Sequence, residues 1–393
     1  MKKLTIVTAT RAEYGLLAPI IKKFINEPEI DVRIAVTGAH LSPEFGMTVK
    51  EIEADGIPID KKIEILLSSD TPVAISKSMG LALISFAEYF DESKPDALMV
   101  LGDRYETLAI ACAAMNARIP IIHLYGGEAT EGAIDEAVRN AITKMSYLHF
   151  TSTEQYKHRV IQMGESPDRV FCVGAMGVEN AKNLSLLSKA ALEDRLGFTL
   201  GDAYAVLTFH PVTLENNTAE QQVKELLEAL TKLPEITFLC TKANADANGR
   251  IINESIEQYA QKYSNIYLVD SLGAQGYLSA VKYAKFVIGN SSSGIVEVPS
   301  FKVPTINIGD RQLGRIQAES IINCVPQENK ILEAVKKALS KEFLDGLNNM
   351  KNPYGEGETS DKIVEATKDY FENEKFKLKK KFYNLFNAKE GWN

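Results

Sequence analysis

The sequence predicts an α/β protein made of two Rossmann-like domains that face each other across a cleft. Short apolar runs alternate with longer amphipathic runs, which is typical of parallel strands connected by helices. The alternation stops in the segment 174–188, GAMGVENAKNLSLLS, and then begins again. A chain of 393 residues that is 45% hydrophobic is long enough for each half to bury its own core.

The first half carries the clearer alternation. Its short apolar runs predict strands at 4–10, 31–37, 57–60, 96–101, 119–125, 148–151 and 170–173. The amphipathic runs predict helices at 16–26, 43–55, 72–91, 105–116, 133–144 and 153–163. Each helix returns the chain to the same edge of the sheet, so the strands are expected to be parallel and their carboxyl ends to converge on one binding edge.

The second half repeats the pattern after the segment 174–188. It predicts strands at 203–209, 236–241, 266–269, 286–289 and 303–308, and helices at 218–232, 249–262 and 274–283. We therefore expect an N-terminal domain over 1–175 and a C-terminal domain over 176–370. The chain is expected to be helical from Asp361, and the segment 371–393 is expected to be a helical, lysine-rich tail that packs back on the N-terminal domain.

Composition excludes several classes of protein. The formal net charge of −8 argues against a broad nucleic-acid surface, so an anionic ligand must meet a local cluster of donors. Four scattered cysteines indicate a reduced, cytoplasmic protein rather than a disulfide framework. Charged residues follow the first apolar run too soon for a signal peptide, and no run reaches the length expected of a membrane span, so no membrane role is expected.

Polar residues follow several predicted strands of the first half. Arg11 lies in TATRAEYG after the first strand, where an arginine suits a phosphate but is also common in surface ion pairs. Asp103 follows the strand 96–101 and Glu128 follows 119–125, and Asp135 comes seven residues later. Carboxylates crowded at one edge would suit proton transfer. The alternatives are a helix cap at Asp103 and three unrelated surface acids.

Two strand ends of the second half predict the other part of the site. His210, in FHPVT, has the best context of the five histidines for acid–base work or phosphate contact. The run KFVIGNSSSGIVEVP predicts a strand, a Ser/Gly turn and a short helix, in which Ser291, Ser292 and Gly294 bring donors and backbone close to an anion and Glu297 suits a ribose. A plain serine cap is the alternative. The segment 244–255 lacks the acid that a calcium loop needs at its end, and no Cys/His spacing supports a zinc site.

The combination of these motifs resembles one family. TRAEYG, GDRYE, GGE followed by IDEAVRNAITK, FHP, GNSSSGIVE and INIGDRQLGR are similar to the UDP-N-acetylglucosamine 2-epimerases over nearly the whole chain. The segment IDEAVRNAITKMSYLHF and the SSSG form resemble the hydrolysing branch, which makes N-acetylmannosamine for sialic acid synthesis. The resemblance implies a GT-B-like fold, in which the second domain binds most of the nucleotide.

The resemblance also implies roles for individual residues. Asp103, Glu128 and Asp135 would be the acid–base set, with His210 beside them, and the residues read alone do not show which carboxylate is the base. The implied substrate-binding residues are Arg11, His40, Arg104, Asn244, Ser291, Ser292, Gly294, Glu297 and Arg311. Arg11, His210 and Arg311 would contact phosphates, and His40 and Arg104 would line the sugar site. No metal and no cofactor are expected.

The implied reaction converts UDP-N-acetylglucosamine and water to N-acetylmannosamine and UDP through elimination to a glycal and hydration. The alternatives are a non-hydrolysing epimerase, a hydrolysing enzyme for a GDP-linked or 2,4-diacetamido-6-deoxy sugar, and a GT-B glycosyltransferase. The family also implies a homodimer or homotetramer, for which the predicted helix 72–91 is a plausible interface.

Overall fold

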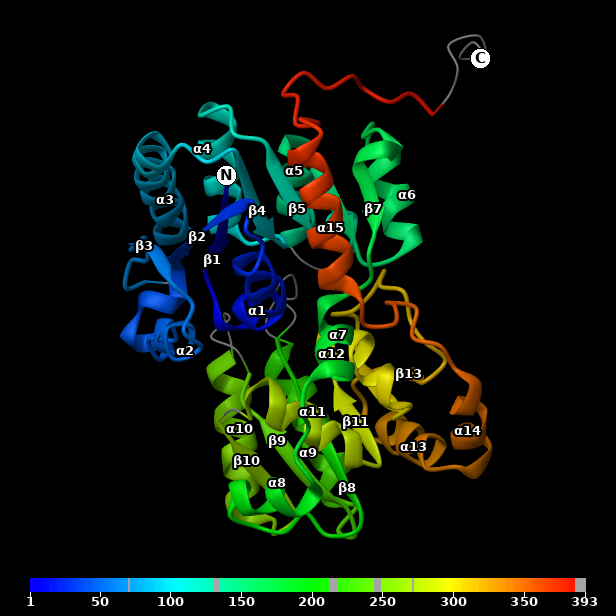
Figure 1. The fold of residues 1–393 in the computed structure, drawn as a ribbon. Helices are drawn as coiled ribbons and strands as arrows, with labels where there is room; N and C mark the ends of the chain where they lie inside the picture. The colour runs from blue at the N-terminus through cyan, green and yellow to red at the C-terminus, as the bar shows by residue number, and fades with distance from the viewer. Residues whose placement is uncertain (70, 131–133, 212–217, 244–248, 271, 386–393) are drawn as a thin grey trace, which may run out of the picture. The chain divides into compact units, whose positions relative to one another are not determined.

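The computed structural model describes the whole chain except residues 70, 131–133, 212–217, 244–248, 271 and 386–393 (Figure 1). The chain divides into two compact units. The first unit contains Met1–Glu128, Asp135–Met176 and Glu358–Asn393, and the second contains Ala129–Ile134 and Gly177–Gly357. Each unit is built on one parallel sheet, which confirms the predicted α/β class with two Rossmann-like domains.

The first unit holds a parallel sheet with the strand order β3-β2-β1-β4-β5-β6-β7. Its strands are β1 (Lys2–Thr8), β2 (Ile30–Thr37), β3 (Ile59–Ile63), β4 (Ala97–Leu101), β5 (Ile121–Leu124), β6 (Leu148–Thr151) and β7 (Val170–Cys172). Its helices are α1 (Arg11–Ile25), α2 (Val49–Ala54), α3 (Pro72–Ser93), α4 (Tyr105–Asn116), α5 (Asp135–Met145), α6 (Glu154–Gln162) and α15 (Thr359–Glu372).

Both faces of this sheet are covered by apolar side chains. Along β4, Met99 and Leu101 belong to the core beneath α1 and α15, whereas Leu98 and Val100 belong to the core beneath α3 and α4. This alternation follows from the two-residue period of a strand, and it explains why β4 is apolar throughout. The sheet therefore leaves mainly its strand ends available for polar chemistry.

Helix α1 shows how the sequence sets a helix at a strand end. Thr10 caps it by accepting a hydrogen bond from the amide of Glu13, and the Glu13 side chain returns to the backbone, which completes a capping box. Leu17, Ile21 and Phe24 follow at helical spacing and are fully buried. Arg11 is the first residue of this helix and is exposed at the carboxyl end of β1.

The second unit holds a parallel sheet with the order β10-β9-β8-β11-β12-β13. Its strands are β8 (Tyr204–Thr208), β9 (Thr237–Thr241), β10 (Ile266–Val269), β11 (Phe286–Gly289), β12 (Thr305–Ile308) and β13 (Ile321–Cys324). Its helices are α7 (Met176–Asn183), α8 (Lys189–Leu196), α9 (Ala219–Thr231), α10 (Gly249–Lys262), α11 (Gly273–Tyr283), α12 (Ser292–Val296), α13 (Glu328–Ala338) and α14 (Lys341–Gly346).

Several predicted elements need correction. Residues 43–55 were expected to form one helix, but Gly46 has a φ of 84° and breaks it, so that α2 begins only at Val49. The segment 174–188 was expected to be a linker, yet most of it forms α7. Strand β13 was not predicted, because its short apolar run lies at the edge of the sheet.

The C-terminal part of the chain also differs from the prediction. Helix α15 was placed in the second domain, but Ile363, Val364 and Phe371 pack in the same core as α1, so the helix belongs to the first unit (Figure 1). The tail after it was expected to be helical. In the described residues 373–385 neither helix nor strand forms. Neighbouring lysines of like charge disfavour a helix, and backbone groups of this segment form hydrogen bonds with other parts of the first unit instead.

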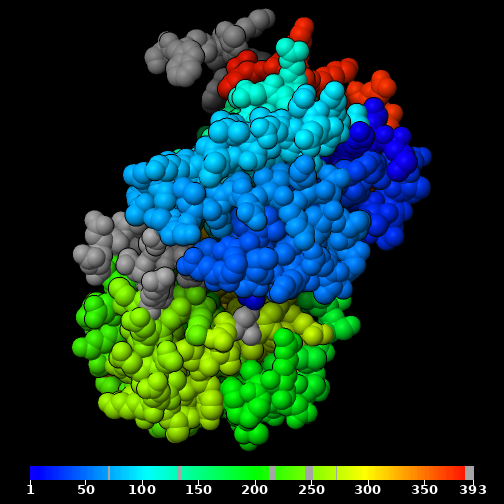
Figure 2. Space-filling model, turned by 90° about the vertical axis from the view of Figure 1, so that its left-hand side faces the viewer, coloured from blue at the N-terminus to red at the C-terminus, as the bar shows by residue number. Residues whose placement is uncertain are grey.

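Helix α3 corrects the expectation that no segment could span a membrane. By length and composition alone its 22 residues are sufficient, with a mean hydropathy of 1.2 over the best window, although one such helix is weak evidence. Ala82, Phe86 and Phe90 on one side of it are buried in the first unit. Figure 2 views the molecule from the side of α3, whose blue to cyan atoms lie at the surface. Val73 and Ile84 are exposed on this helix.

Candidate functional site

A buried arginine connects the polar residues at the strand ends of the first unit. Arg139 lies one turn into α5, and its side chain is only 2% exposed. Its Nη2 bonds a carboxylate oxygen of Asp103, which follows β4. Its Nη1 donates to the carbonyl of Glu128, at 2.8 Å, and to Glu136, at 3.1 Å. A buried guanidinium requires such partners, so the Arg139 cluster holds the loops after β4 and β5 together.

Glu128 is fixed on both its backbone and its side chain. It is 5% exposed, and its Oε1 accepts a hydrogen bond of 2.8 Å from the Ser152 hydroxyl, which follows β6. Gly127 before it has a φ of 79°, and a Cβ there would lie 2.4 Å from the carbonyl oxygen of Tyr156. The backbone therefore packs closely at Gly127, and this packing sets the direction of the following carboxylate.

Asp135 begins α5 one helical turn before Arg139. Side chains at this spacing share a helix face, so Asp135 lies on the same side of α5 as Arg139. The structure thus joins Asp103 and Glu128 through Arg139, and it places Asp135 on the helix that carries this arginine.

Arg104 belongs to a second charged group beside the first. Its Nε donates to the buried Glu106, at 2.6 Å, and its guanidinium lies 6.0 Å from the ring of Tyr105. Glu13 approaches this group from α1. Burial and the nearby Glu106 carboxylate raise the pKa of Glu13 to about 7, while Arg104 opposes the rise. Arg104 itself is 42% exposed, which keeps it available to a ligand.

His40 is enclosed in the first unit. Its ring is fully buried, with Nε2 3.0 Å from the Thr8 hydroxyl and Nδ1 2.8 Å from the Thr48 hydroxyl. Burial lowers the pKa of His40 to about 4, so it stays neutral near pH 7. Both ring nitrogens thus bond threonines, one at the end of β1 and one before α2, and the role of His40 at the sugar site stays a prediction.

In the second unit, an asparagine connects three strand ends. Asn290 is 1% exposed, accepts from the amide of His210 at 2.7 Å and donates to its carbonyl at 2.8 Å. Its own carbonyl accepts from Arg311 at 3.1 Å and from Gln312 at 2.8 Å. This Asn290 cluster brings together the loops after β8, β11 and β12, which is the convergence predicted for parallel strands.

The imidazole of His210 is neutral near pH 7. Burial and, to a smaller extent, the positive charge of Arg311 lower its pKa to about 3. A neutral imidazole can accept or donate a hydrogen bond but adds no positive charge. Fixed positive charge in the Asn290 cluster therefore comes from Arg311.

The Ser/Gly turn and the short helix after it both form as predicted. Ser291 caps α12 by accepting from the amide of Ser293, and Ser292 is exposed at the first helical position. A Cβ on Gly294 would lie 2.8 Å from Thr305, so this glycine permits close packing on β12. Glu297 follows α12, and a Cβ on Gly177 would lie 2.1 Å from its Oε1. Gly177 on α7 thus leaves the space that the Glu297 carboxylate occupies.

Two predictions concern Asn244 and metal binding. Asn244 lies outside the described residues. Within the part of the chain that the structure describes, no group of three or more His, Cys, Asp or Glu side chains is arranged to hold a metal ion.

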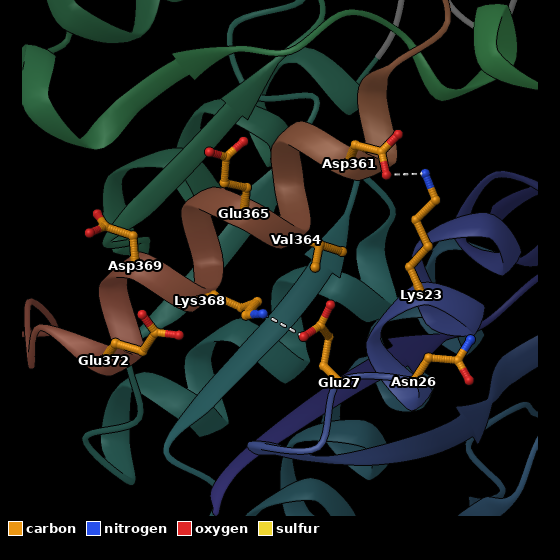
Figure 3. Close-up of a pocket in the computed structure, with 9 residues that line it drawn as sticks. All are labelled: Lys23, Asn26, Glu27, Asp361, Val364, Glu365, Lys368, Asp369 and Glu372. Atoms are coloured by element: carbon orange, nitrogen blue, oxygen red, sulfur yellow. Dashed lines mark hydrogen bonds and ion pairs between the residues drawn. The ribbon is translucent and has the colours of Figure 1, made fainter.

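A groove of about 650 Å³ between α1 and α15 lies elsewhere in the first unit (Figure 3). Lys23 and Asp361 close one end of it, and Glu27 and Lys368 form a second ion pair, each at 2.5 Å. Its α1 residues belong to the C-terminal end of the helix, whereas the strand carboxyl ends adjoin the N-terminal end. The groove is therefore separate from the Arg139 cluster.

Sequence reasoning missed several residues in and beside the two clusters: Arg139, Ser152, Glu13, Gly177, Gln312, and Asn290 in its role of joining three loops. Arg139 had one available signal, since an arginine at helical spacing after two acids on a predicted helix can pair with them. Ser152 and Gln312 had none, because their partners are distant in the sequence.

Comparisons with known proteins agree with these observations. Residues 22–368 match the family UDP-N-acetylglucosamine 2-epimerase. The chain is 47% identical over 343 residues to the GDP/UDP-N,N'-diacetylbacillosamine 2-epimerase (hydrolyzing) of Campylobacter jejuni, over 87% of this chain and 88% of that protein. It is 40% identical over 386 residues to the polysialic acid biosynthesis protein P7 of Escherichia coli, over 98% of each.

A solved structure supports the fold. The UDP-GlcNAc 2-epimerase of Neisseria meningitidis, bound to UDP-GlcNAc, matches 94% of this chain and 100% of its own with a TM-score of 0.80 at 20% identity. The motifs, the two parallel sheets and the similarity along the chain agree. This chain belongs to the UDP-N-acetylglucosamine 2-epimerase family, in its hydrolysing branch.

Proposed function

We propose that this protein hydrolyses a nucleotide-linked 2-acetamido sugar and inverts its C2, releasing a nucleoside diphosphate and a free 2-acetamido sugar. The observation that carries the proposal is the Arg139 cluster, in which one buried arginine joins Asp103 to the backbone of Glu128. Carboxylates held at strand ends suit a reaction that first removes and later delivers a proton.

The chemistry explains why carboxylates are needed. The C2 proton of the sugar is not adjacent to a carbonyl, so it cannot be removed as in an enolisation. In the first step a carboxylate takes this proton, a double bond forms between C1 and C2, and the C1–O bond to the diphosphate breaks. In the second step water adds its hydroxyl at C1 and gives its other proton to a carboxylate, while an acid returns a proton to C2 on the opposite face. Asp103, Glu128 and Asp135 share these proton transfers.

We assign the nucleotide to the second unit. Arg311 supplies positive charge for the diphosphate, His210 and Ser292 supply hydrogen bonds, and Glu297 accepts from the ribose hydroxyls. Support comes from the contacts that hold the first two of these residues on Asn290. Preorganised donors aimed at a leaving group that gains charge often contribute more to catalysis than any other effect. Arg11, which is exposed, and Arg104, which is partly exposed, lie in the first unit. In this proposal they are further contacts for the phosphates or the sugar.

The substrate that we favour is nucleotide-linked N,N'-diacetylbacillosamine. The support is the 47% identity to the Campylobacter jejuni enzyme named for that sugar. UDP-N-acetylglucosamine, the precursor of sialic acid, is the second candidate and is favoured by the similarity to the polysialic acid biosynthesis protein over 98% of each chain.

A substrate panel in deuterated water tests both the reaction and the substrate. The purified chain is incubated with UDP- and GDP-linked forms of both sugars, and proton NMR follows C1 and C2. We expect a free sugar that has deuterium at C2, together with released nucleoside diphosphate. A product that remains nucleotide-linked would contradict hydrolysis, and transfer to an acceptor with protium kept at C2 would indicate a glycosyltransferase. The sugar and base with the highest kcat/KM identify the substrate.

Replacing Glu128 by Gln tests its role as an acid–base group. Glutamine keeps the shape and can still accept a hydrogen bond from Ser152, but it cannot exchange a proton. We expect kcat to fall at least about 100-fold with the Kd for UDP unchanged. The exposed Glu154→Gln in α6 is the matched control and should keep wild-type kcat. Unaltered turnover of Glu128→Gln would make Glu128 a structural residue only.

A further inference from the structure

The chain after α15 lies along the first unit as an extended segment, the C-terminal strap (375–383). The carbonyl of Lys375 accepts from the Tyr147 hydroxyl at 3.0 Å, and Phe376 packs against Phe371 with ring centroids 5.1 Å apart. Near its other end the amide of Tyr383 donates to the carbonyl of Gly164 at 2.8 Å. The strap is thus attached at several positions along its length.

Lys380 makes the most contacts in this strap. Its Nζ shares one of its three N–H groups between the two oxygens of Glu165, at 2.9 and 3.0 Å. It also donates to the carbonyl of Lys144 at 2.8 Å and to that of Ser146 at 2.6 Å. Lys144 is in the last turn of α5, where carbonyls lack helical partners and carry the negative end of the helix dipole. Lys380 therefore caps the C-terminal end of α5.

Glu165 connects the strap to β6. It is 1% exposed, and its partners are Lys144, Lys380, Arg169 and, in β6, His149 at 3.4 Å. Burial alone would raise the pKa of Glu165, but hydrogen bonds from His149, Lys144 and Lys380 outweigh it and hold the pKa well below its usual range. The carboxylate is thus a fixed negative charge that holds Lys380 in place.

The two elements fixed in this way carry the Arg139 cluster. Helix α5 has its C-terminal end at Lys380 and bears Arg139 and Asp135 toward its N-terminal end. Near the start of β6, His149 contacts Glu165. The strand is followed by Ser152, whose hydroxyl donates to Glu128. A shift of α5 or β6 along its axis would therefore move Arg139 or the Glu128 side chain.

We propose that Lys380 is a positioning residue for the reaction: through the C-terminal end of α5 and through Glu165 it sets the place of Arg139, Asp135 and Glu128. The inference rests on the proposed function of these carboxylates, since it concerns their alignment. Misplacement of reacting groups by about 1 Å can cost on the order of 100-fold in rate.

The test compares Lys380→Met with Lys379→Met in the full chain. Lys379 is adjacent and exposed, so its variant also removes one positive charge but leaves Lys380 at the C-terminal end of α5. Both variants are assayed with the substrate that the panel identifies, well below their unfolding temperatures, and amide hydrogen exchange is followed in the last turn of α5. We expect kcat of Lys380→Met to fall at least about tenfold with KM within about twofold, and exchange there to quicken. Lys380→Arg should recover part of kcat.

A second variant covers the possibility that Lys380→Met folds poorly. In Lys380→Met combined with Glu165→Gln, the buried carboxylate is neutralised together with its partner, and the same fall in kcat is expected. Wild-type kcat and exchange in Lys380→Met, or a fall equalled by Lys379→Met, would overturn the inference. An inactive wild-type chain would instead count against the proposed function. Even then, faster amide exchange in the last turn of α5 in Lys380→Met would show that Lys380 stabilises that end of the helix.

Discussion

Arg139 shows what residue-level contacts add to a motif. The acids around it were identifiable as candidates from their positions after strands, whereas the arginine that joins them was not, because a charge on an amphipathic helix is usually solvated. Its burial reverses that interpretation, since a guanidinium is rarely buried without partners. His40 is the opposite case, a predicted sugar-site residue whose ring nitrogens bond threonines within the fold.

Gly177 gives a prediction at the same scale. In Gly177→Ala the new methyl group would lie 2.1 Å from Glu297 Oε1 and 2.9 Å from its Cγ, so the carboxylate must move. If Glu297 binds the ribose, the Kd for UDP should rise roughly tenfold, which corresponds to about 1.4 kcal/mol. Isothermal titration calorimetry measures it. Gly346→Ala in α14, where nothing lies within 4 Å of the new Cβ, is the matched control. Equal affinities in the two variants would separate Glu297 from nucleotide binding.

Glu13 predicts a pH dependence of stability. Its pKa in the folded chain, about 7, lies above its ordinary value of 4.5. Between these pH values the folded chain keeps a proton that the unfolded chain has lost, so this group's contribution to stability falls as pH rises from about 4.5 to 7 and is constant above. Glu13→Gln removes this titration. We expect the variant to gain stability relative to wild type by roughly 1–3 kcal/mol between pH 5 and pH 8.

Urea unfolding at pH 5 and pH 8 measures this difference. Glu44→Gln, at an exposed position in the same unit, should show none of it. If the free energies of unfolding of the wild type and Glu13→Gln change equally between pH 5 and pH 8, Glu13 is ionised at both pH values and the predicted rise in its pKa is wrong.

At the scale of elements, the sequence predicts strands better than it predicts which unit a helix joins. The runs at 236–241, 266–269 and 286–289 agree closely with β9, β10 and β11, because buried parallel strands are short and apolar. The helical pattern of α15 was visible too, but its partner α1 is more than 300 residues away. No local pattern specifies a contact at that separation.

The place of α15 can be tested through its buried face. Ile363 is 1% exposed and packs in the core shared with α1. Ile363→Ala should lower the free energy of unfolding of the first unit by about 2–5 kcal/mol, since the cavity cannot fully collapse. Lys362→Ala is the neighbouring control and should cost little, because its ion pair with Glu358 is exposed. Urea unfolding followed by circular dichroism would compare them, and equal midpoints would place α15 outside the core.

At the scale of the whole molecule, α3 is the strongest candidate for contact between copies of the chain. Val73, Leu81 and Ile84 are exposed on it, opposite the side that packs in the first unit. Exposed apolar side chains that gather on one helix are typical of an interface. We expect an oligomer in solution, and Ile84→Asp, at a position 61% exposed, should shift the mass toward the monomer. Multi-angle light scattering measures the mass, with Lys224→Asp at an exposed position on α9 as the control. A monomeric wild type would exclude this role.

The return of the chain to its first unit has a consequence for biosynthesis. Lys23 on α1 and Asp361 on α15 are 338 positions apart in the sequence, yet they form an ion pair at the edge of one core. At about 5–20 residues per second, a ribosome needs roughly 20–70 s to make the chain between them. During that time the second unit can fold completely, while the apolar face of α1 still lacks its cover. The core of the nascent first unit therefore lacks Ile363 and Phe371 until its last helix emerges, and the apolar side chains that they cover stay open to chaperones.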